Sequence, residues 1–215
     1  MIELAGITRS FGRTRVLDGV SLTVPDRGRV VITGPSGSGK TTLLRIIAGL
    51  DAPDAGTVRI NGKIASDPAI RIPPADRGIG FVFQNAALWP HLTVAGNIRF
   101  ALHDHPAIDA AARIDELLDR MSIRHLKDRY PGGISGGEAR RVALARALAP
   151  CPSWLLLDEP LTNIDDELKE DLLVLIDETA RSAGSGIVYV THNRHEAAAI
   201  AETSFVCRGG VILPP

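Results

Sequence analysis

The segment Gly34-Pro35-Ser36-Gly37-Ser38-Gly39-Lys40-Thr41 constrains the fold of this chain more than any other. It matches the phosphate-binding loop, in which a glycine and four further residues precede Gly-Lys-Thr. The glycines let backbone N–H groups turn toward phosphate oxygens, and a helix that starts after the loop adds its positive dipole end. We expect Lys40 to contact the β- and γ-phosphates and Thr41 to offer its hydroxyl to Mg²⁺, with Thr42 beside them. The segment predicts a nucleotide site between a strand at 30–33 and a helix at 42–50.

A second motif is an acidic strand end. Residues 154–157 are apolar and run directly into Asp158 and Glu159. In a chain that already has a phosphate loop, Asp158 is expected to hold Mg²⁺, and Glu159 to orient or deprotonate the attacking water. The alternative is that both carboxylates only end the strand in solvent, which is common for one acid and less so for two.

The rest of the chain alternates between the periodicities of strands and helices. Apolar residues at every second position predict strands near 20–24, 57–61 and 79–83, whereas the spacing in 108–121 and 138–149 is helical. Between residues 154 and 207 strands and helices alternate, which favours a mainly parallel sheet with helices on its faces. The predicted fold class is therefore α/β, with a small helical subdomain inserted into the core.

The overall composition excludes some classes of protein. The net charge is −1 and 45% of the residues are apolar, so bulk charge gives no reason to expect a nucleic-acid partner. Cys151 and Cys207 have neither metal-ligand nor redox spacing. The N-terminus does not resemble a secretory signal, and no apolar stretch approaches the roughly 18–20 residues that span a bilayer. We expect any membrane role to come through a partner.

The segment Ile134-Ser135-Gly136-Gly137-Glu138 distinguishes this chain from other nucleotide-binding proteins. It opens a helix, so Ser135 and the amides of Gly136 and Gly137 predict a second anion-binding helix N-terminus. One nucleotide does not need two such sites in one chain, but two chains facing head to tail would use both. At this point the sequence resembles the ABC ATPase family, whose signature is usually Leu-Ser-Gly-Gly-Gln; Glu138 replaces the glutamine.

The resemblance implies roles for four further residues. Phe11 lies where the family has an aromatic residue that stacks on adenine, although a core phenylalanine fits the sequence equally well. Gln84 follows a strand as in the family's glutamine loop, where it would contact Mg²⁺ and the attacking water. Asp165 matches the aspartate that reaches across the dimer interface. His192 ends a strand and matches the histidine that contacts the γ-phosphate. The other five histidines are interpreted as structural.

The resemblance also implies an architecture and a set of partners. It predicts one ABC ATPase domain over 1–215, with a RecA-like core and an N-terminal antiparallel β subdomain in about 1–85 and 150–215, and a helical signature subdomain in about 86–149. The ligands would be ATP and Mg²⁺. The partners would be transmembrane permease subunits, a second ATPase subunit (most simply the same chain) and a substrate-binding protein. The chain would lie on the cytoplasmic face of the membrane and power import.

The segment Leu88–Val94 resembles the part of bacterial importer ATPases that receives a helix of the permease, although Trp89 and Leu92 could instead pack the helical subdomain. The Glu138 variant also resembles export systems, which leaves the direction of transport open. Chromosome and repair ATPases insert a long coiled coil, for which the interval from Lys40 to Ser135 leaves no room. A phosphate-loop kinase would need an acceptor pocket and a lid instead of a second anion site.

Overall fold

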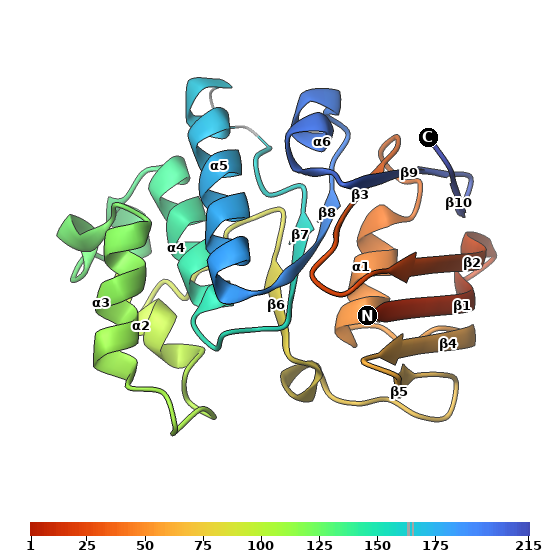
Figure 1. Cartoon of the computed structure of the whole chain (residues 1–215), viewed down its shortest axis with the longest axis horizontal. Coiled ribbons are helices and arrows are strands. Elements are labelled where there is room, and N and C mark those ends of the chain that lie inside the picture. Colours follow the sequence, from red (N-terminus) through yellow and green to blue (C-terminus); the bar gives the residue numbers. More distant parts are fainter. Residues whose placement is uncertain (163, 165) are drawn as a thin grey trace.

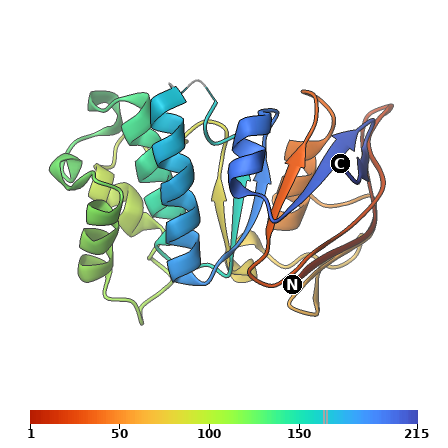
Figure 2. The ribbon, with the colours of Figure 1, turned by 45° about the horizontal axis from the view of Figure 1, so that its top comes forward.

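The computed structural model describes residues 1–162, 164 and 166–215, with no account of the side chains of 166 and 167. These residues form two β-sheets and a group of helices (Figure 1). Figure 2 shows the helical group at one end of the molecule and the N-terminal sheet at the other. Within the described part of the chain, no helix has both the length and the apolar character needed to cross a membrane.

The larger sheet has six strands in the order β10-β9-β3-β8-β7-β6. All neighbouring strands are parallel except β9 and β10. The strand bounds are β3 Arg29–Thr33, β6 Ile79–Val82, β7 Trp154–Asp158, β8 Gly186–Val190, β9 Thr203–Arg208 and β10 Val211–Leu213. The predicted α/β class with a mainly parallel sheet is confirmed. The predicted strand over 79–83 ends one residue earlier, at Val82.

The smaller sheet is antiparallel and has the order β2-β1-β4-β5. Its strands are β1 Ile2–Phe11, β2 Thr14–Val24, β4 Ala55–Ile60 and β5 Lys63–Ser66. The turn from β4 to β5 has Asn61 and Gly62 at positive φ, as expected of an Asn-Gly pair. Because β2 contacts β10, this sheet lies against the edge of the parallel one.

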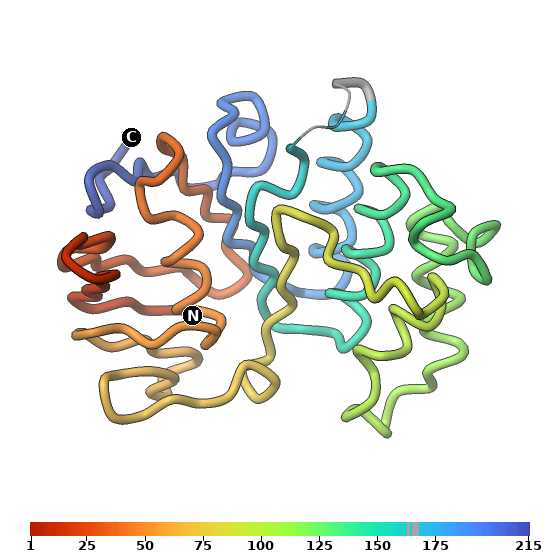
Figure 3. The backbone as a smooth tube through the Cα atoms, turned by 180° about the vertical axis from the view of Figure 1, so that it is seen from behind, coloured from red at the N-terminus to blue at the C-terminus, as the bar shows by residue number. Residues whose placement is uncertain are grey.

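The helices occupy both faces of the parallel sheet. Helix α1 (Lys40–Ala48) lies between the two sheets, whereas the other helices lie on the opposite side (Figures 1 and 3). These are α2 Val94–Phe100, α3 Ala110–Arg120, α4 Gly136–Leu148, α5 Asp166–Ala183 and α6 Arg194–Ile200. Short 3-10 helices are present at Pro74–Arg77, Arg124–Leu126 and Pro131–Gly133. Helix α2 was not predicted from the sequence, because its seven residues are too few for a clear period.

Alternate residues of the parallel strands belong to two different hydrophobic cores. In β7, Trp154 and Leu156 pack with α1 and the antiparallel sheet, whereas Leu155 and Leu157 pack with the helices of the other face. All five residues of β7 and all five of β8 are buried. A parallel sheet covered on both faces is built from such continuous apolar strands, which explains why the runs 154–157 and 187–190 are almost free of polar residues.

A buried arginine joins α1 to the segment that leads into β6. The guanidinium of Arg77 donates to the carbonyls of Ile46 and Ile47 at the end of α1. It also donates to the carbonyls of Ala65 and Ile72 and to Ser66 Oγ, and all five distances lie between 2.6 and 3.2 Å. Burial lowers the pKa of Arg77 to about 10, which leaves it charged at neutral pH. A positive charge at a helix C-terminus is favourable. The helix that begins at the phosphate loop is thus fixed at its other end by Arg77.

We predict that Arg77→Met lowers stability, because it leaves several buried acceptors without a donor. Each such loss costs about 1–3 kcal/mol, so the free energy of unfolding should fall by at least about 3 kcal/mol. Thermal unfolding followed by circular dichroism measures the effect. The exposed Arg13 provides the matched control, Arg13→Met, which should leave the melting temperature unchanged. Equal melting temperatures for the two variants would contradict this interpretation.

Candidate nucleotide-binding site

The phosphate loop spans Gly34–Gly39, between β3 and α1. Gly34 and Gly39 have φ of 147° and 109°. A Cβ on Gly34 would lie 2.2 Å from the Cys207 carbonyl oxygen, and one on Gly39 would lie 2.8 Å from the Val16 carbonyl oxygen. Gly39 is also the N-cap of α1 and supplies no side-chain cap. The first-turn N–H groups of α1 therefore remain available to an anion.

Lys40 is held in a fixed direction by the loop that it follows. Its Nζ donates to the carbonyls of Gly34 at 2.8 Å and Pro35 at 2.9 Å, and lies 3.7 Å from Glu159 Oε1. The side chain is only 4% exposed. An ammonium group has three hydrogens, so the two carbonyls leave one for a further acceptor. Lys40 is thus a positioned cation at the floor of the site.

A cavity of about 450 Å³ lies over this loop. It joins the phosphate loop to parts of the chain that are distant in sequence; its lining residues are Phe11, Val16, Ser36, Gly37, Gly39, Lys40, Thr41, Thr42, Gln84 and Glu159. The predicted residues Phe11, Gln84 and Glu159 are therefore brought together with the loop. Val16 was not predicted, because nothing in the sequence shows which residue of β2 faces the loop.

Phe11 is not a core residue. It ends β1 with 49% of its surface exposed, and the guanidinium of Arg9 lies 4.8 Å from the centre of its ring. Arg9 is itself fixed by Asp54 at 2.8 Å. An exposed ring at the wall of the cavity has a free π-surface, which is what stacking on a base requires.

Thr41 and Asp158 form a direct link between α1 and β7. Thr41 Oγ1 donates to Asp158 Oδ1 at 3.0 Å, and Asp158 is 4% exposed. Burial raises the pKa of Asp158, against the lowering effect of the Thr41 hydrogen bond. A hydroxyl and a buried carboxylate side by side are oxygen donors of the kind that Mg²⁺ takes with phosphate oxygens and water. The two residues therefore fit the metal that the motif implies.

Glu159 has an unusual backbone conformation. Its φ is +44°, in the left-handed region, which costs about 1–2 kcal/mol for a residue with a Cβ. The Glu159 N–H donates to the Val190 carbonyl at 2.9 Å, and Thr162 Oγ1 donates to the Glu159 carbonyl at 3.1 Å. Glu159 is the first residue after β7, so the positive φ occurs where the strand ends. Such strained residues are concentrated at functional sites.

The carboxylate of Glu159 is surrounded by candidate partners. His192 Nδ1 lies 3.1 Å from Oε2, Thr162 Oγ1 lies 3.4 Å from the same oxygen, and Lys40 approaches the other oxygen. His192 follows β8 and is 56% exposed, whereas Glu159 is 14% exposed. The two strand ends thus place Glu159 and His192, both predicted site residues, side by side. Thr162 was not predicted, although it follows Glu159 by only three residues.

Two arginines of α4 hold the segment after β6, which includes Gln84. Arg140 Nη1 donates to the Phe83 carbonyl at 3.1 Å, and Arg146 donates to the carbonyls of Ala86 at 3.1 Å and Ala87 at 2.7 Å. Burial lowers the pKa of both arginines. The sequence shows the arginines but not these contacts, because carbonyl acceptors have no residue signature.

The signature segment begins α4 with a reciprocal capping box. The Ser135 N–H donates to Glu138 Oε2 at 2.7 Å, and the Glu138 N–H donates to Ser135 Oγ at 3.3 Å. The hydrogen bond from the Ser135 N–H to the carboxylate holds the pKa of Glu138 below its usual range. The carboxylate that replaces the expected glutamine therefore caps its own helix. A Cβ on Gly137 would lie 2.4 Å from Leu168 Cδ2, so this glycine allows close packing against α5.

The signature segment lies apart from the phosphate loop of the same chain. Among the described residues, none of Ser135, Gly136, Gly137 and Glu138 lines the cavity over Lys40. Helices α1 and α4 lie on opposite sides of β7 and β8 (Figures 1 and 3). The two predicted anion sites are thus separate within one chain. Asp165, the predicted interface residue, lies outside the described residues.

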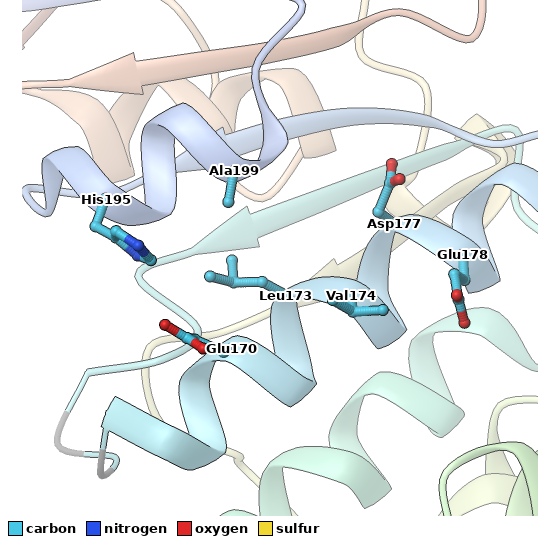
Figure 4. Close-up of a pocket in the computed structure, with 7 residues that line it drawn as sticks. All are labelled: Glu170, Leu173, Val174, Asp177, Glu178, His195 and Ala199. Carbon is cyan, nitrogen blue, oxygen red and sulfur yellow. The ribbon is translucent and has the colours of Figure 1, made fainter.

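A hollow of about 390 Å³ between α5 and α6 contains none of the predicted site residues. Its lining is mainly acidic and apolar, and includes Glu170, Val174 and Glu178 of α5 and His195 of α6 (Figure 4). It offers no glycine loop and no cluster of cations. The cavity over Lys40 is therefore the candidate site for a nucleotide.

The parallel sheet, the glycine loop that opens α1 and the Thr41–Asp158 pair define a P-loop NTPase. The family model of the ABC transporter matches residues 17–162. The chain therefore belongs to the ABC transporter family, as one of its ATP-binding cassettes.

The relatives include transport proteins and a solved cassette. The Fe(3+) ions import ATP-binding protein FbpC of Yersinia pestis biovar Antiqua is 46% identical over 210 residues, which are 97% of this chain and 60% of the relative. The sulfate/thiosulfate import ATP-binding protein CysA of Escherichia coli K12 is 44% identical, over 98% of this chain and 58% of the relative. This chain thus spans about three fifths of these relatives. The dimeric cassette MJ0796 bound to ADP and Pi has a TM-score of 0.88 and 30% identity, over 99% of this chain and 96% of that one.

We predict that Lys40→Met weakens nucleotide binding at least tenfold, because a charge-assisted hydrogen bond contributes about 1.5–3 kcal/mol. Isothermal titration with a non-hydrolysable ATP analogue measures the dissociation constant. Lys63→Met, at an exposed lysine of β5, is the control and should bind as the wild type does. A folded Lys40→Met protein with unchanged affinity would remove the cavity from consideration as the nucleotide site.

Proposed function

We propose that this chain hydrolyses ATP in a head-to-tail dimer and drives transport through a partner permease. The observation that supports hydrolysis most directly is that Lys40 and Glu159 line one cavity, with His192 Nδ1 3.1 Å from the Glu159 carboxylate. The proposal also includes the subdomains expected from the sequence. These are the core with its β subdomain in about 1–85 and 150–215, and the helical signature subdomain in about 86–149.

Each residue has a distinct task in this proposal. The loop amides and Lys40 bind the phosphate groups, and Phe11 stacks on the adenine. Glu159 orients a water molecule and accepts its proton as the water oxygen bonds to the γ-phosphorus and the bond to the β-phosphate oxygen breaks. His192 contacts the γ-phosphate, and Gln84 contacts the attacking water. Thr41, Asp158 and Gln84 would hold Mg²⁺, which neutralises charge on the phosphates.

We predict that Glu159→Gln binds MgATP, hydrolyses it at least a hundredfold more slowly and accumulates as a closed dimer. The amide keeps the shape of the side chain but is not a base, so the binding energy remains stored in the associated state. Size exclusion with light scattering measures the mass, and phosphate release measures the rate. Wild type with ATP and the variant without nucleotide are the controls. A variant that hydrolyses at the wild-type rate would exclude Glu159 from catalysis.

The dimer follows from the separation of the two anion sites. Ser135 and the first amides of α4 open a helix on the far side of the sheet from Lys40. In a head-to-tail pair, this helix end of one chain would cover the γ-phosphate held by the other chain. Two solved structures of MJ0796, a cassette of the same fold, are dimeric, which supports a dimer here.

Mixing two inactive variants tests this arrangement. Ser135→Arg and Lys40→Met should each have little ATPase activity as homodimers. A heterodimer contains one composite site with both Lys40 and Ser135 intact, so the mixture should recover measurable hydrolysis. Ser135→Arg should still bind nucleotide as a monomer, which titration measures. If the mixture stays inactive while heterodimers form, the head-to-tail arrangement is wrong.

The permease would dock beside the segment Leu88–Val94. The rings of Trp89 and Phe100 lie 5.5 Å apart, and 43% and 57% of their surfaces are exposed. Phe100 also lines a cavity of about 570 Å³, together with Phe81 and Arg146. The side chain of the buried Asn97 fixes this segment. It accepts a hydrogen bond from the Trp89 N–H and donates to the carbonyls of Trp89, Leu92 and Thr93. Exposed aromatic side chains on a fixed backbone suit an apolar helix of a partner.

We predict that Trp89→Ala and Phe100→Ala reduce transport by the assembled system at least fivefold while the isolated subunit keeps its ATPase rate. The aromatic pair lies outside the nucleotide cavity, so its loss removes docking surface only. Uptake into vesicles and phosphate release by the free subunit are measured in parallel. Val174→Ala on α5, 57% exposed, is the control. Equal loss of both activities would instead indicate that the rings pack the helical subdomain.

The direction and place of transport are also part of the proposal. The names of both curated relatives describe import, of Fe(3+) ions in one case and of sulfate or thiosulfate in the other. Import of a small ion with the help of a substrate-binding protein is the corresponding proposal here. The chain would then be attached to the cytoplasmic face of the membrane through the permease. Identification of the permease that copurifies with it tests this assignment.

A further inference from the structure

Glu196 is a buried carboxylate that the proposed chemistry does not use. It belongs to α6, is 5% exposed and lies four residues after His192. His195 and Ala199 of the same helix line the open hollow against α5 (Figure 4). The Glu196 carboxylate instead reaches Tyr189 and Thr191 at the end of β8. A carboxylate at such a place needs an explanation, because taking a charge out of water costs several kcal/mol.

The hydrogen bonds of Glu196 set the direction of a chain of contacts. Its Oε2 accepts from Thr191 Oγ1 at 2.7 Å and from Tyr189 OH at 3.0 Å. The Thr191 hydrogen is thereby committed to Glu196, so its oxygen serves as an acceptor for the Asn193 N–H at 3.0 Å. Asn193 Oδ1 in turn accepts from the His195 N–H at 2.8 Å. The residues before and after His192 are thus both fixed.

These hydrogen bonds fix the backbone on both sides of His192. The Thr191 N–H donates to the Ile32 carbonyl of β3, two residues before the phosphate loop. The His192 side chain is 56% exposed. Its ring contacts the site through Nδ1, which lies 3.1 Å from Glu159 Oε2. An exposed ring with one such contact depends on its backbone for its position. That backbone is held on both sides through Thr191, whose hydroxyl depends on Glu196.

The hydrogen bonds of Glu196 also contribute to stability. Its removal leaves the buried hydroxyls of Tyr189 and Thr191 without this acceptor, at a cost of about 1–3 kcal/mol each. The neighbours of Glu196 include Ala197 and Ile200, which are buried in the apolar core. A methionine would fill the same space without a desolvation cost. It could not, however, accept the two hydroxyl hydrogens.

We propose that Glu196 is a positioning residue for hydrolysis, which acts through Thr191 to hold His192 against Glu159. The inference rests on the proposed roles of Glu159 and His192. It assigns to Glu196 no contact with the nucleotide. Loss of the carboxylate should therefore change the rate of the bound complex and leave nucleotide affinity unchanged.

Three variants with graded chemistry test the proposal. Glu196→Gln keeps an oxygen that can accept both hydroxyl hydrogens, and should retain kcat within about twofold. Glu196→Met removes the acceptor, and Thr191→Val removes the hydroxyl while keeping the shape. Both should lower kcat at least tenfold with KM for ATP within twofold. Circular dichroism and binding of a non-hydrolysable ATP analogue confirm that each variant is folded and competent to bind.

A double-mutant cycle separates positioning from a merely structural effect. If Glu196 acts through His192, then Glu196→Met added to His192→Ala should not lower kcat further. A further loss that multiplies the single effects would overturn the proposal, as would wild-type kcat in folded Glu196→Met and Thr191→Val. Wild-type hydrolysis by His192→Ala would instead contradict the proposed role of His192. If Glu196→Met fails to fold, the cycle with Thr191→Val decides in the same way.

Discussion

The parallel pairing of β3, β7 and β8 between two hydrophobic cores determines where every other part of this chain can lie. Alternate side chains of these strands enter opposite cores, so the strands cannot shift by one residue without moving each side chain to the wrong face. Parallel strands also end at the same edge of the sheet. The phosphate loop, the Asp158–Glu159 pair and His192 follow three such ends, and their proximity is a consequence of the pairing.

Much of this arrangement could be predicted from the sequence, because its signals are local. The phosphate loop needs glycines at fixed positions, and the runs at 154–157 and 187–190 are apolar since both faces of the sheet are covered. The position of Phe11 was left open, because an aromatic residue at a strand end has the same local pattern whether it is buried or exposed. Its 49% exposure depends on how β1 meets β2, which is a tertiary property.

Many of the contacts that were not predicted run from side chains to backbone carbonyls. Arg77 at the end of α1, and Arg140 and Arg146 beside the loop of Gln84, all use acceptors that any residue can supply. The same holds for Asn97 beneath Trp89. A sequence shows the donor in each case, but the acceptor is chosen by the folded chain. The reciprocal capping by Glu138 was not predicted either, although its spacing from Ser135 is a local signal.

The exposed pair of Trp89 and Phe100 has a consequence for the life of the subunit outside its assembly. Two large rings are partly exposed to solvent, and Asn97 holds the backbone at Trp89 in place. A copy made in excess of its partner therefore presents an apolar surface to other proteins. We expect synthesis to be matched to the supply of the partner, and unassembled copies to be recognised by chaperones and proteases.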